Sequence, residues 1–310
     1  MRTVLLLTFA SLLIGVGCDR SSNSDGGKPR VVATTMMIGD LVRQISGDKV
    51  ELRVLFGPTV DPHTYKPSMG DYEDLKRAKL VFYNGLHLEG KMVEDFENRL
   101  KDKSVAIVRD MPHDRLLPWA EGETGAHDPH VWFDVSLWAE AAKVVASELA
   151  KMDPANAEHY KQNAEKLQES MRQLHEYVTQ RANTVPREQR VLITSHDAFH
   201  YFGKAYGFDV RGLQGISTET EAGTANIQAA VDFIVQRKIP AIFVESSVPR
   251  STIERVKNDV TSRGLRVTIG GELFSDAMGT ADEHPGYRSD TYEGMIRYNI
   301  DTIVNALTKK

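Results

Sequence analysis

Four side chains that could bind a metal ion lie far apart in this chain, each in a short polar segment that follows an apolar, strand-like run. They are His63, His130, His196 and Asp276, and gaps of 67, 66 and 80 residues separate them. Zinc-finger ligands occur in close pairs, so this spacing excludes a local zinc finger. It favours loops that meet at the carboxyl ends of parallel strands, in a cleft between two α/β lobes.

The donor atoms indicate which ion such a site would take and what it would do with it. Three neutral imidazoles and one carboxylate suit a divalent ion of the Zn²⁺ or Mn²⁺ class. Four protein ligands from two lobes would enclose the ion, whereas a catalytic metal keeps one position open for water or substrate. The pattern therefore favours a metal carrier and not an enzyme.

Two of the histidines follow the same stiff dipeptide. Asp-Pro precedes both His63 and His130, and proline restricts the backbone in front of each imidazole. A single loop histidine is more often an ordinary surface residue. Because the same rigid unit occurs twice, both histidines are stronger candidates than either would be alone.

His196 has a competing interpretation. With His200 it forms the segment His-Asp-Ala-Phe-His, which differs from the zincin pattern His-Glu-x-x-His by one acidic residue, so an exported zinc metallohydrolase using His196 and His200 is the alternative function. The zincin pair lies within a helix, whereas His196 directly follows the apolar run Val191–Thr194. We therefore favour a loop ligand, and we expect His200 to pack beside Tyr201 and Phe202.

The acidic candidates are weaker signals. Asp276 lies in a loop just after the last predicted strand, and on composition Glu272 or Asp282 could take its place. Glu245 closes another apolar run, where its carboxylate could accept a hydrogen bond from a metal-binding imidazole or cap the next helix.

The amino terminus predicts export. Residues 1–17 combine an early arginine with the apolar run Val4–Val16, which is too short to span a bilayer and is typical of a signal peptide. Cys18 follows small residues, as the lipid-bearing cysteine of bacterial lipoproteins does, although Gly15 departs from the usual leucine. Residues 18–29 are polar and Gly/Ser-rich, so we expect a flexible, lipid-anchored tether. Since Cys18 is the only cysteine, no disulfide can form within the chain.

Charge and length narrow the class of protein. The net charge of −5, with lysines and arginines scattered along the chain, excludes a typical nucleic-acid-binding protein. The part beyond the tether is longer than one hydrophobic core usually serves. We expect an N-terminal lobe at 30–152, a linking helix at 153–185 and a C-terminal lobe at 186–310.

Short apolar runs alternate with helical patterns in both halves, which predicts an α/β fold in which each lobe has a parallel β-sheet flanked by helices. Predicted strands lie near 30–35, 50–56, 80–83, 105–108, 191–194, 210–213, 241–244 and 267–269. Predicted helices lie near 38–46, 69–78, 88–100, 135–150, 199–206, 225–237, 252–263 and 292–307, with Ser68 and Asp134 as N-caps. Between the halves, an apolar stripe with steps of three and four predicts one long helix that begins at Pro154 and is capped by Asp153.

Five segments together resemble the substrate-binding lipoproteins of zinc and manganese ABC importers, the zinc-uptake component A and manganese-binding lipoprotein family (cluster A-I). They are Gly57–Ser68, Tyr83–Glu89, Asp128–Trp132, Thr194–Phe199 and Val244–Ser247. The resemblance covers nearly all of the chain beyond the tether. It implies two α/β lobes joined by one rigid helix.

The resemblance also implies a function. One divalent ion, Mn²⁺ or Zn²⁺ and in some members Fe²⁺, would bind between the lobes on His63, His130, His196 and Asp276, as cargo for a membrane permease. No P-loop pattern occurs, so a separate subunit would hydrolyse ATP. We expect a monomer held by its lipid on the outer face of the cell membrane, with a cell-adhesion lipoprotein as a rival.

One feature of the sequence bears on which metal is bound. Zinc-dedicated members of the family usually carry a long His-rich loop before the second ligand. Here residues 111–130 contain only His113 and His127 besides His130 itself. This departure argues against a dedicated zinc scavenger.

Overall fold

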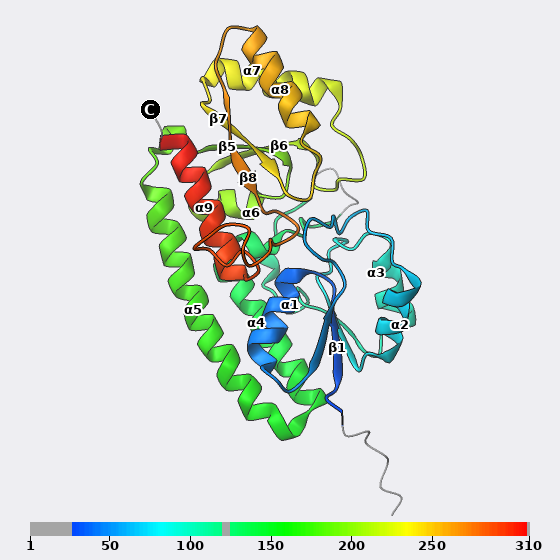
Figure 1. Ribbon diagram of the computed structural model, residues 1–310. Helices are drawn as coiled ribbons and strands as arrows, with labels where there is room; N and C mark the ends of the chain where they lie inside the picture. Colours follow the sequence, from blue (N-terminus) through cyan, green and yellow to red (C-terminus); the bar gives the residue numbers. More distant parts are fainter. Residues whose placement is uncertain (1–26, 120–124, 309–310) are drawn as a thin grey trace, which may run out of the picture.

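Two α/β lobes lie one above the other, and a long helix runs along both (Figure 1). The structure is a computed structural model that describes residues 27–119 and 125–308. The predicted signal peptide, Cys18 and most of the predicted tether lie outside the described residues. Within the described residues, no helix is both long and apolar enough to cross a membrane.

The first lobe is built on a parallel four-stranded sheet in the order β2-β1-β3-β4. Its strands are β1 (Arg30–Ala33), β2 (Glu51–Val54), β3 (Leu80–Tyr83) and β4 (Ser104–Ala106). Its helices are α1 (Met36–Ser46), α2 (Met69–Arg77), α3 (Met92–Glu94) and α4 (Val135–Met152). The predicted N-caps are confirmed, since Ser68 forms a capping box with Asp71 and the Asp134 carboxylate accepts two backbone N–H groups of α4.

The predicted helix at 88–100 is wrong in its extent. Only Met92–Glu94 is α-helical, and a π-helical turn, Asp95–Arg99, follows it. The backbone before it passes through positive φ at Leu86, His87 and Gly90, which an α-helix does not allow. At Gly90 (φ 49°) a Cβ atom would lie 2.5 Å from the His63 carbonyl oxygen, so this turn requires glycine and packs against the His63 loop.

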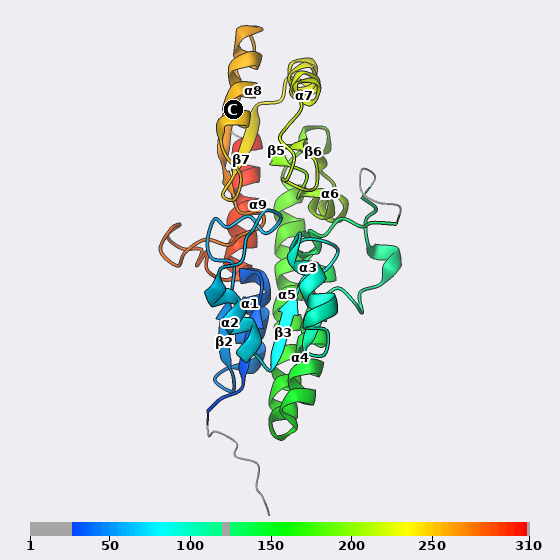
Figure 2. The same cartoon turned by 90° about the vertical axis from the view of Figure 1, so that its right-hand side faces the viewer.

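The second lobe contains two parallel strand pairs that adjoin along β5 and β7 (Figure 2). Its strands are β5 (Val191–His196), β6 (Asp209–Gln214), β7 (Ala241–Glu245) and β8 (Thr268–Leu273). Its helices are α6 (His200–Tyr206), α7 (Thr224–Arg237), α8 (Ser251–Ser262) and α9 (Tyr292–Thr308). The predicted α/β class with parallel sheets is confirmed in both lobes.

The linking helix α5 (Ala157–Asn183) begins three residues later than predicted. Pro154–Asn156 forms a 3₁₀ turn, and Asp153 makes no N-cap hydrogen bond; its carboxylate instead accepts hydrogen bonds from the side chains of Asn156 and Tyr160. The predicted apolar stripe is buried. It packs on α1 and α4 in the first lobe and on α6 and α9 in the second.

One hydrophobic cluster joins the two lobes through this helix. It includes Phe82 of the first sheet, Leu167 of α5 and Phe243 of the second sheet, all of them buried. The opposite faces of the two sheets carry separate, smaller clusters. The lobes therefore share a continuous core along α5.

Candidate metal centre

The four predicted metal-binding residues meet between the lobes. His63 lies in the loop after β2, and His130 lies in the segment that leads into α4. His196 is the last residue of β5, and Asp276 lies in the loop after β8. For His63, His196 and Asp276 this arrangement follows from parallel topology, because parallel strands end at the same edge of their sheet. The prediction that a strand directly precedes each candidate is wrong for His130, because β4 ends at Ala106.

Their donor atoms enclose a space of the size of one ion. Nε2 of His63 lies 3.3 Å from Nε2 of His130. The Asp276 carboxylate lies 3.6 Å, 3.4 Å and 3.3 Å from Nε2 of His63, His130 and His196. Metal–nitrogen bonds of 2.0–2.1 Å in a tetrahedron give donor–donor edges of about 3.3 Å. The quoted distances are near such an edge, and all four ligand atoms lie within 4.8 Å of one another, which leaves room for one ion.

Burial makes the centre a closed one. His130 and His196 are fully buried, and the exposed fractions of His63 and Asp276 are 5% and 2%. Both oxygens of Asp276 and Nε2 of His196 have no hydrogen-bond partner among the described residues. Buried polar atoms are normally satisfied, so these atoms fit a site that is completed by a bound cation.

Two carboxylates orient the imidazoles of His130 and His196 by contacting Nδ1, the ring nitrogen that faces away from the centre. Oδ1 of Asp128 lies 2.7 Å from Nδ1 of His130, and Oε2 of Glu245 lies 2.6 Å from Nδ1 of His196. The other Glu245 oxygen accepts the backbone N–H of His196 at 2.9 Å. A carboxylate at Nδ1 keeps the proton there and leaves Nε2 free to bind metal.

The sequence did not predict what the aspartates of the repeated Asp-Pro-His unit do. Asp61 accepts the backbone N–H of His63 at 2.9 Å, and Asp128 accepts that of His130 at the same distance. The unit is therefore a turn in which the aspartate fixes the backbone of the histidine that follows. Its recurrence was the available signal.

The charges of the centre shift its pKa values in different directions. Burial lowers the pKa of His63 to about 3, with further lowering by the neighbouring imidazoles. Burial also opposes the charged form of His196, but the carboxylates of Glu245 and Asp276 outweigh it and raise that pKa well above its usual value. Against its own burial, the imidazoles hold the pKa of Asp276 well below its usual range. The carboxylate is thus ready as an anionic donor.

The structure contradicts the expectations for the other candidates. His200 does not merely pack beside its aromatic neighbours: Nδ1 lies 3.3 Å from Asp128, and the side chain lies outside the four-residue cluster. Glu272 pairs instead with Arg250 at 3.2 Å, and Asp282 is exposed. Without His200 in the centre, the metallohydrolase alternative is not supported.

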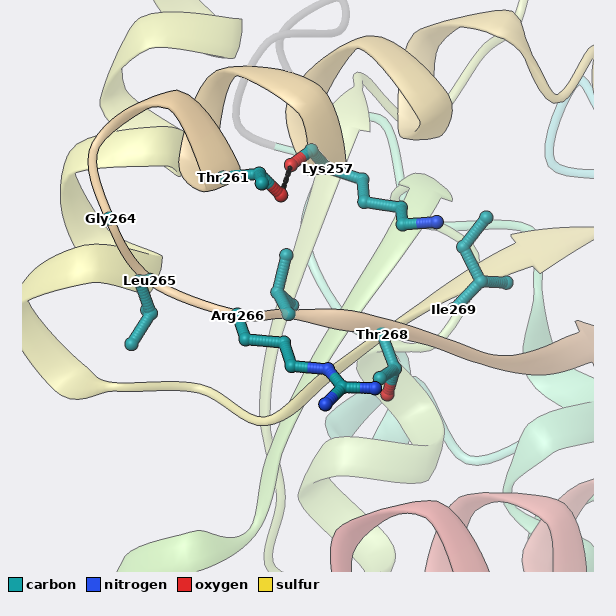
Figure 3. A pocket seen from close by; sticks show the side chains of 8 residues that line it. Lys257, Thr261, Gly264, Leu265, Arg266, Thr268 and Ile269 are labelled. Carbon is teal, nitrogen blue, oxygen red and sulfur yellow. Dashed lines mark hydrogen bonds between the residues drawn. The ribbon is translucent and has the colours of Figure 1, made fainter.

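A separate hollow of about 700 Å³ lies between α8 and β8 (Figure 3). It shares no residue with the metal centre, and Lys257 and Arg266 give its lining a positive charge that would repel a cation.

A buried centre of three imidazoles and one carboxylate, closed between two α/β lobes on a common long helix, defines a solute-binding protein for metal ions. The comparison with known families agrees over almost the whole described chain. The chain belongs to the family of the periplasmic zinc-uptake complex component A, whose model matches residues 31–306.

Two similar relatives come from different bacteria. The zinc-binding protein TroA of Treponema pallidum is 48% identical over 284 residues, which cover 91% of this chain and 90% of TroA. The manganese-binding lipoprotein MntA of Bacillus subtilis is 42% identical over 309 residues, which cover 99% and 98% of the two chains. The solved structure of T. pallidum TroA superimposes with a TM-score of 0.86 at 46% identity and covers 91% of this chain and all of its own. These relatives are named for metal binding, and the fold agrees with the family.

Proposed function

We propose that this chain captures one divalent transition-metal ion, Mn²⁺ or Zn²⁺, outside the cytoplasm and delivers it to an ABC permease driven by a separate ATPase subunit. The metal ligands are His63, His130, His196 and Asp276. The observation that carries the proposal is the convergence of three buried imidazoles on one buried carboxylate, with Nε2–oxygen distances of 3.6 Å, 3.4 Å and 3.3 Å. The family supports the role of a carrier, with no catalytic step.

Titration calorimetry of the purified, chelator-treated protein tests the site. We expect one ion per chain, and we expect replacement of any of the four ligands by alanine to weaken binding at least a hundredfold. His113→Ala, in an exposed position, is the control and should bind as the wild type does. Two tight sites, or wild-type affinity in His130→Ala, would refute the assignment.

The same material gives a second test through stability. An ion that binds only the folded chain, at a free concentration of 100 times its dissociation constant, adds about 2.7 kcal/mol to the free energy of unfolding. Mn²⁺ and Zn²⁺ should therefore both raise the melting temperature. The ion carried in the cell is identified by elemental analysis of protein purified from the native host, because imidazole sites bind Zn²⁺ more tightly whichever ion is physiological.

We also propose that Cys18 carries a lipid that holds the monomeric protein on the outer face of the membrane, with residues 18–29 as the tether. The names of several relatives, which include the word lipoprotein, support this assignment. Cys18→Ala should yield exported protein that leaves the membrane fraction. Retention of the variant in that fraction would contradict the assignment.

The proposed division of the chain is 30–152, 153–185 and 186–310. It is supported by the position of α5, which packs on helices from both halves. Cleavage of a protease site engineered into a surface loop at each of the two boundaries should leave three fragments that remain associated through the shared core. Dissociation without denaturant would argue against a rigid link.

A further inference from the structure

A hydrogen bond crosses between the lobes directly beside the metal centre. The indole Nε1–H of Trp132, two residues after His130, donates to the carbonyl oxygen of Ser275 at 3.0 Å. Ser275 immediately precedes Asp276, and both Trp132 and Ser275 are fully buried. The first lobe thus holds the backbone that carries the acidic ligand of the second lobe.

The same loop is held from its other side by α9. The side-chain amide of Asn299 donates to the carbonyl oxygen of Phe274 at 2.7 Å and accepts the N–H of Phe274 at 3.0 Å. Asn299 is 2% exposed, so both bonds are shielded from water. A paired amide contact of this kind fixes the position and the direction of the backbone two residues before Asp276.

The start of α9 is in turn tied to the first lobe. The backbone N–H of Tyr292 donates to Asp40 of α1 at 3.0 Å, and the Tyr292 hydroxyl donates to the carbonyl oxygen of Trp132 at 2.6 Å. Asn299 and Tyr292 lie two turns apart on the same helix. The contacts therefore form a closed ring from Trp132 through the Asp276 loop and α9 back to Trp132.

The Asp276 carboxylate depends on this ring for its position. Neither of its oxygens has a hydrogen-bond partner among the described residues. The groups that face the carboxylate are the imidazoles of the centre, at 3.6 Å, 3.4 Å and 3.3 Å, and these would turn to the ion; the backbone of residues 274–276 therefore sets where the carboxylate lies.

We propose that Trp132 and Asn299 are positioning residues that hold Asp276 at bonding distance from the ion, and that Asp276 is the first ligand to withdraw on release. Separation of the lobes breaks the Trp132–Ser275 bond together with the two bonds that Tyr292 makes to the first lobe, while Asn299 keeps the Phe274 backbone attached to α9, so the loop moves away with the second lobe. This inference rests on the proposed function of the site, because it concerns how that site retains its ion.

The test compares two buried tryptophans in the full-length protein. Trp132→Phe removes the N–H that Ser275 accepts. Trp138→Phe is the matched control, because Trp138 is also fully buried and its ring contacts those of Trp132 and Tyr292 at centroid distances of 6.4 Å and 5.9 Å. Its own Nε1 has no partner among the described residues, so the control reproduces the packing loss without the hydrogen-bond loss.

We expect Trp132→Phe to raise the dissociation constant for Zn²⁺, measured by chelator competition, about tenfold. Trp138→Phe should change it less than about twofold. Both variants should lower the melting temperature of the metal-free protein, and Trp132→Phe should lower it further because it also leaves the Ser275 carbonyl without its donor. The visible spectrum of bound Co²⁺, which reports coordination geometry, should change only in Trp132→Phe. Equal Zn²⁺ affinity and equal Co²⁺ spectra in the two variants would overturn the inference.

A second variant keeps the test independent of Trp132. Asn299→Asp preserves the acceptor for the Phe274 N–H but replaces the donor with a repelling oxygen, so Zn²⁺ affinity should also fall about tenfold. Wild-type affinity in Asn299→Asp would overturn the role of α9. The two levels of failure are distinct: a wild-type protein that binds no metal refutes the proposed function, whereas normal binding with insensitive variants refutes only the positioning ring.

Discussion

The buried imidazole of His63 should make the metal-free protein sensitive to acid. Its pKa lies at about 3 in the folded chain, against 6.5 in the unfolded chain. Between these pH values His63 is protonated in the unfolded chain and neutral in the folded chain. The free energy of unfolding therefore rises with pH and falls on acidification. The contribution is complete above about pH 6.5 and is lost as the pH falls toward 3.

The magnitude follows from the size of the shift. At about pH 4.5, two units below the unfolded pKa and above the folded one, His63 alone costs about 2.7 kcal/mol relative to pH 8. The same shift keeps His63 free of protons at pH 5, so this residue does not lose metal to protons there. The burial that keeps the His63 imidazole neutral, and so able to bind metal, also makes the folded chain less stable in acid.

Urea denaturation of chelator-treated protein, at several pH values between about 4.5 and 8, measures the effect. We expect the difference in unfolding free energy between wild type and His63→Asn to shift by about 3 kcal/mol over this range. Titrating groups remote from His63 are common to both proteins and cancel in that difference. A difference that is constant with pH would refute the buried, neutral state of His63.

Three further predictions concern groups around the centre. Glu245→Gln should weaken Zn²⁺ binding about tenfold or more, because an amide N–H facing Nδ1 of His196 forces the proton onto the metal-binding nitrogen; equal affinity by chelator competition would contradict this. Thr218→Val removes a hydrogen bond of 2.6 Å to Asp61 in the opposite lobe, and stopped-flow measurement should show metal dissociation accelerated about fivefold, whereas an unchanged rate would exclude a role for this contact in closure. Burial raises the pKa of Glu89 to about 7; the folded chain therefore keeps a proton that the unfolded chain loses near 4.5, and stability falls as the pH rises between these values. Glu89→Gln should abolish that fall in urea denaturation, and an unchanged slope would argue against it.

Local patterns predicted the elements, and the errors have local causes. The buried stripe of α5 and the caps at Ser68 and Asp134 depend on neighbours three or four residues away, so periodicity and residue type were sufficient. The prediction of a helix near residue 90 was wrong because hydrophobic periodicity does not reveal a positive φ. Gly90 has a positive φ and packs closely against the backbone of His63.

The residues of the metal centre could be predicted from the sequence, but the contacts that hold them in place could not. The four metal-binding candidates were predicted because loops after parallel strands converge, and the structure brings them together. The hydrogen bond from Trp132 to Ser275 joins residues 143 positions apart, and neither residue type nor spacing predicts it. Contacts of this kind depend on the relative orientation of the two lobes on the helix α5, which the sequence pattern does not give.

The core that both lobes share along α5 has a consequence for the lifetime of the protein. Because residues of both sheets and α5 pack in one cluster, unfolding of either lobe removes packing from the other. Stabilisation by a bound ion then protects every segment at once, and proteolysis slows in proportion to the decrease in open forms. Carriers that hold an ion will outlast empty ones in the presence of extracellular proteases. At a constant rate of synthesis, we therefore expect the abundance of this protein to rise with the metal supply.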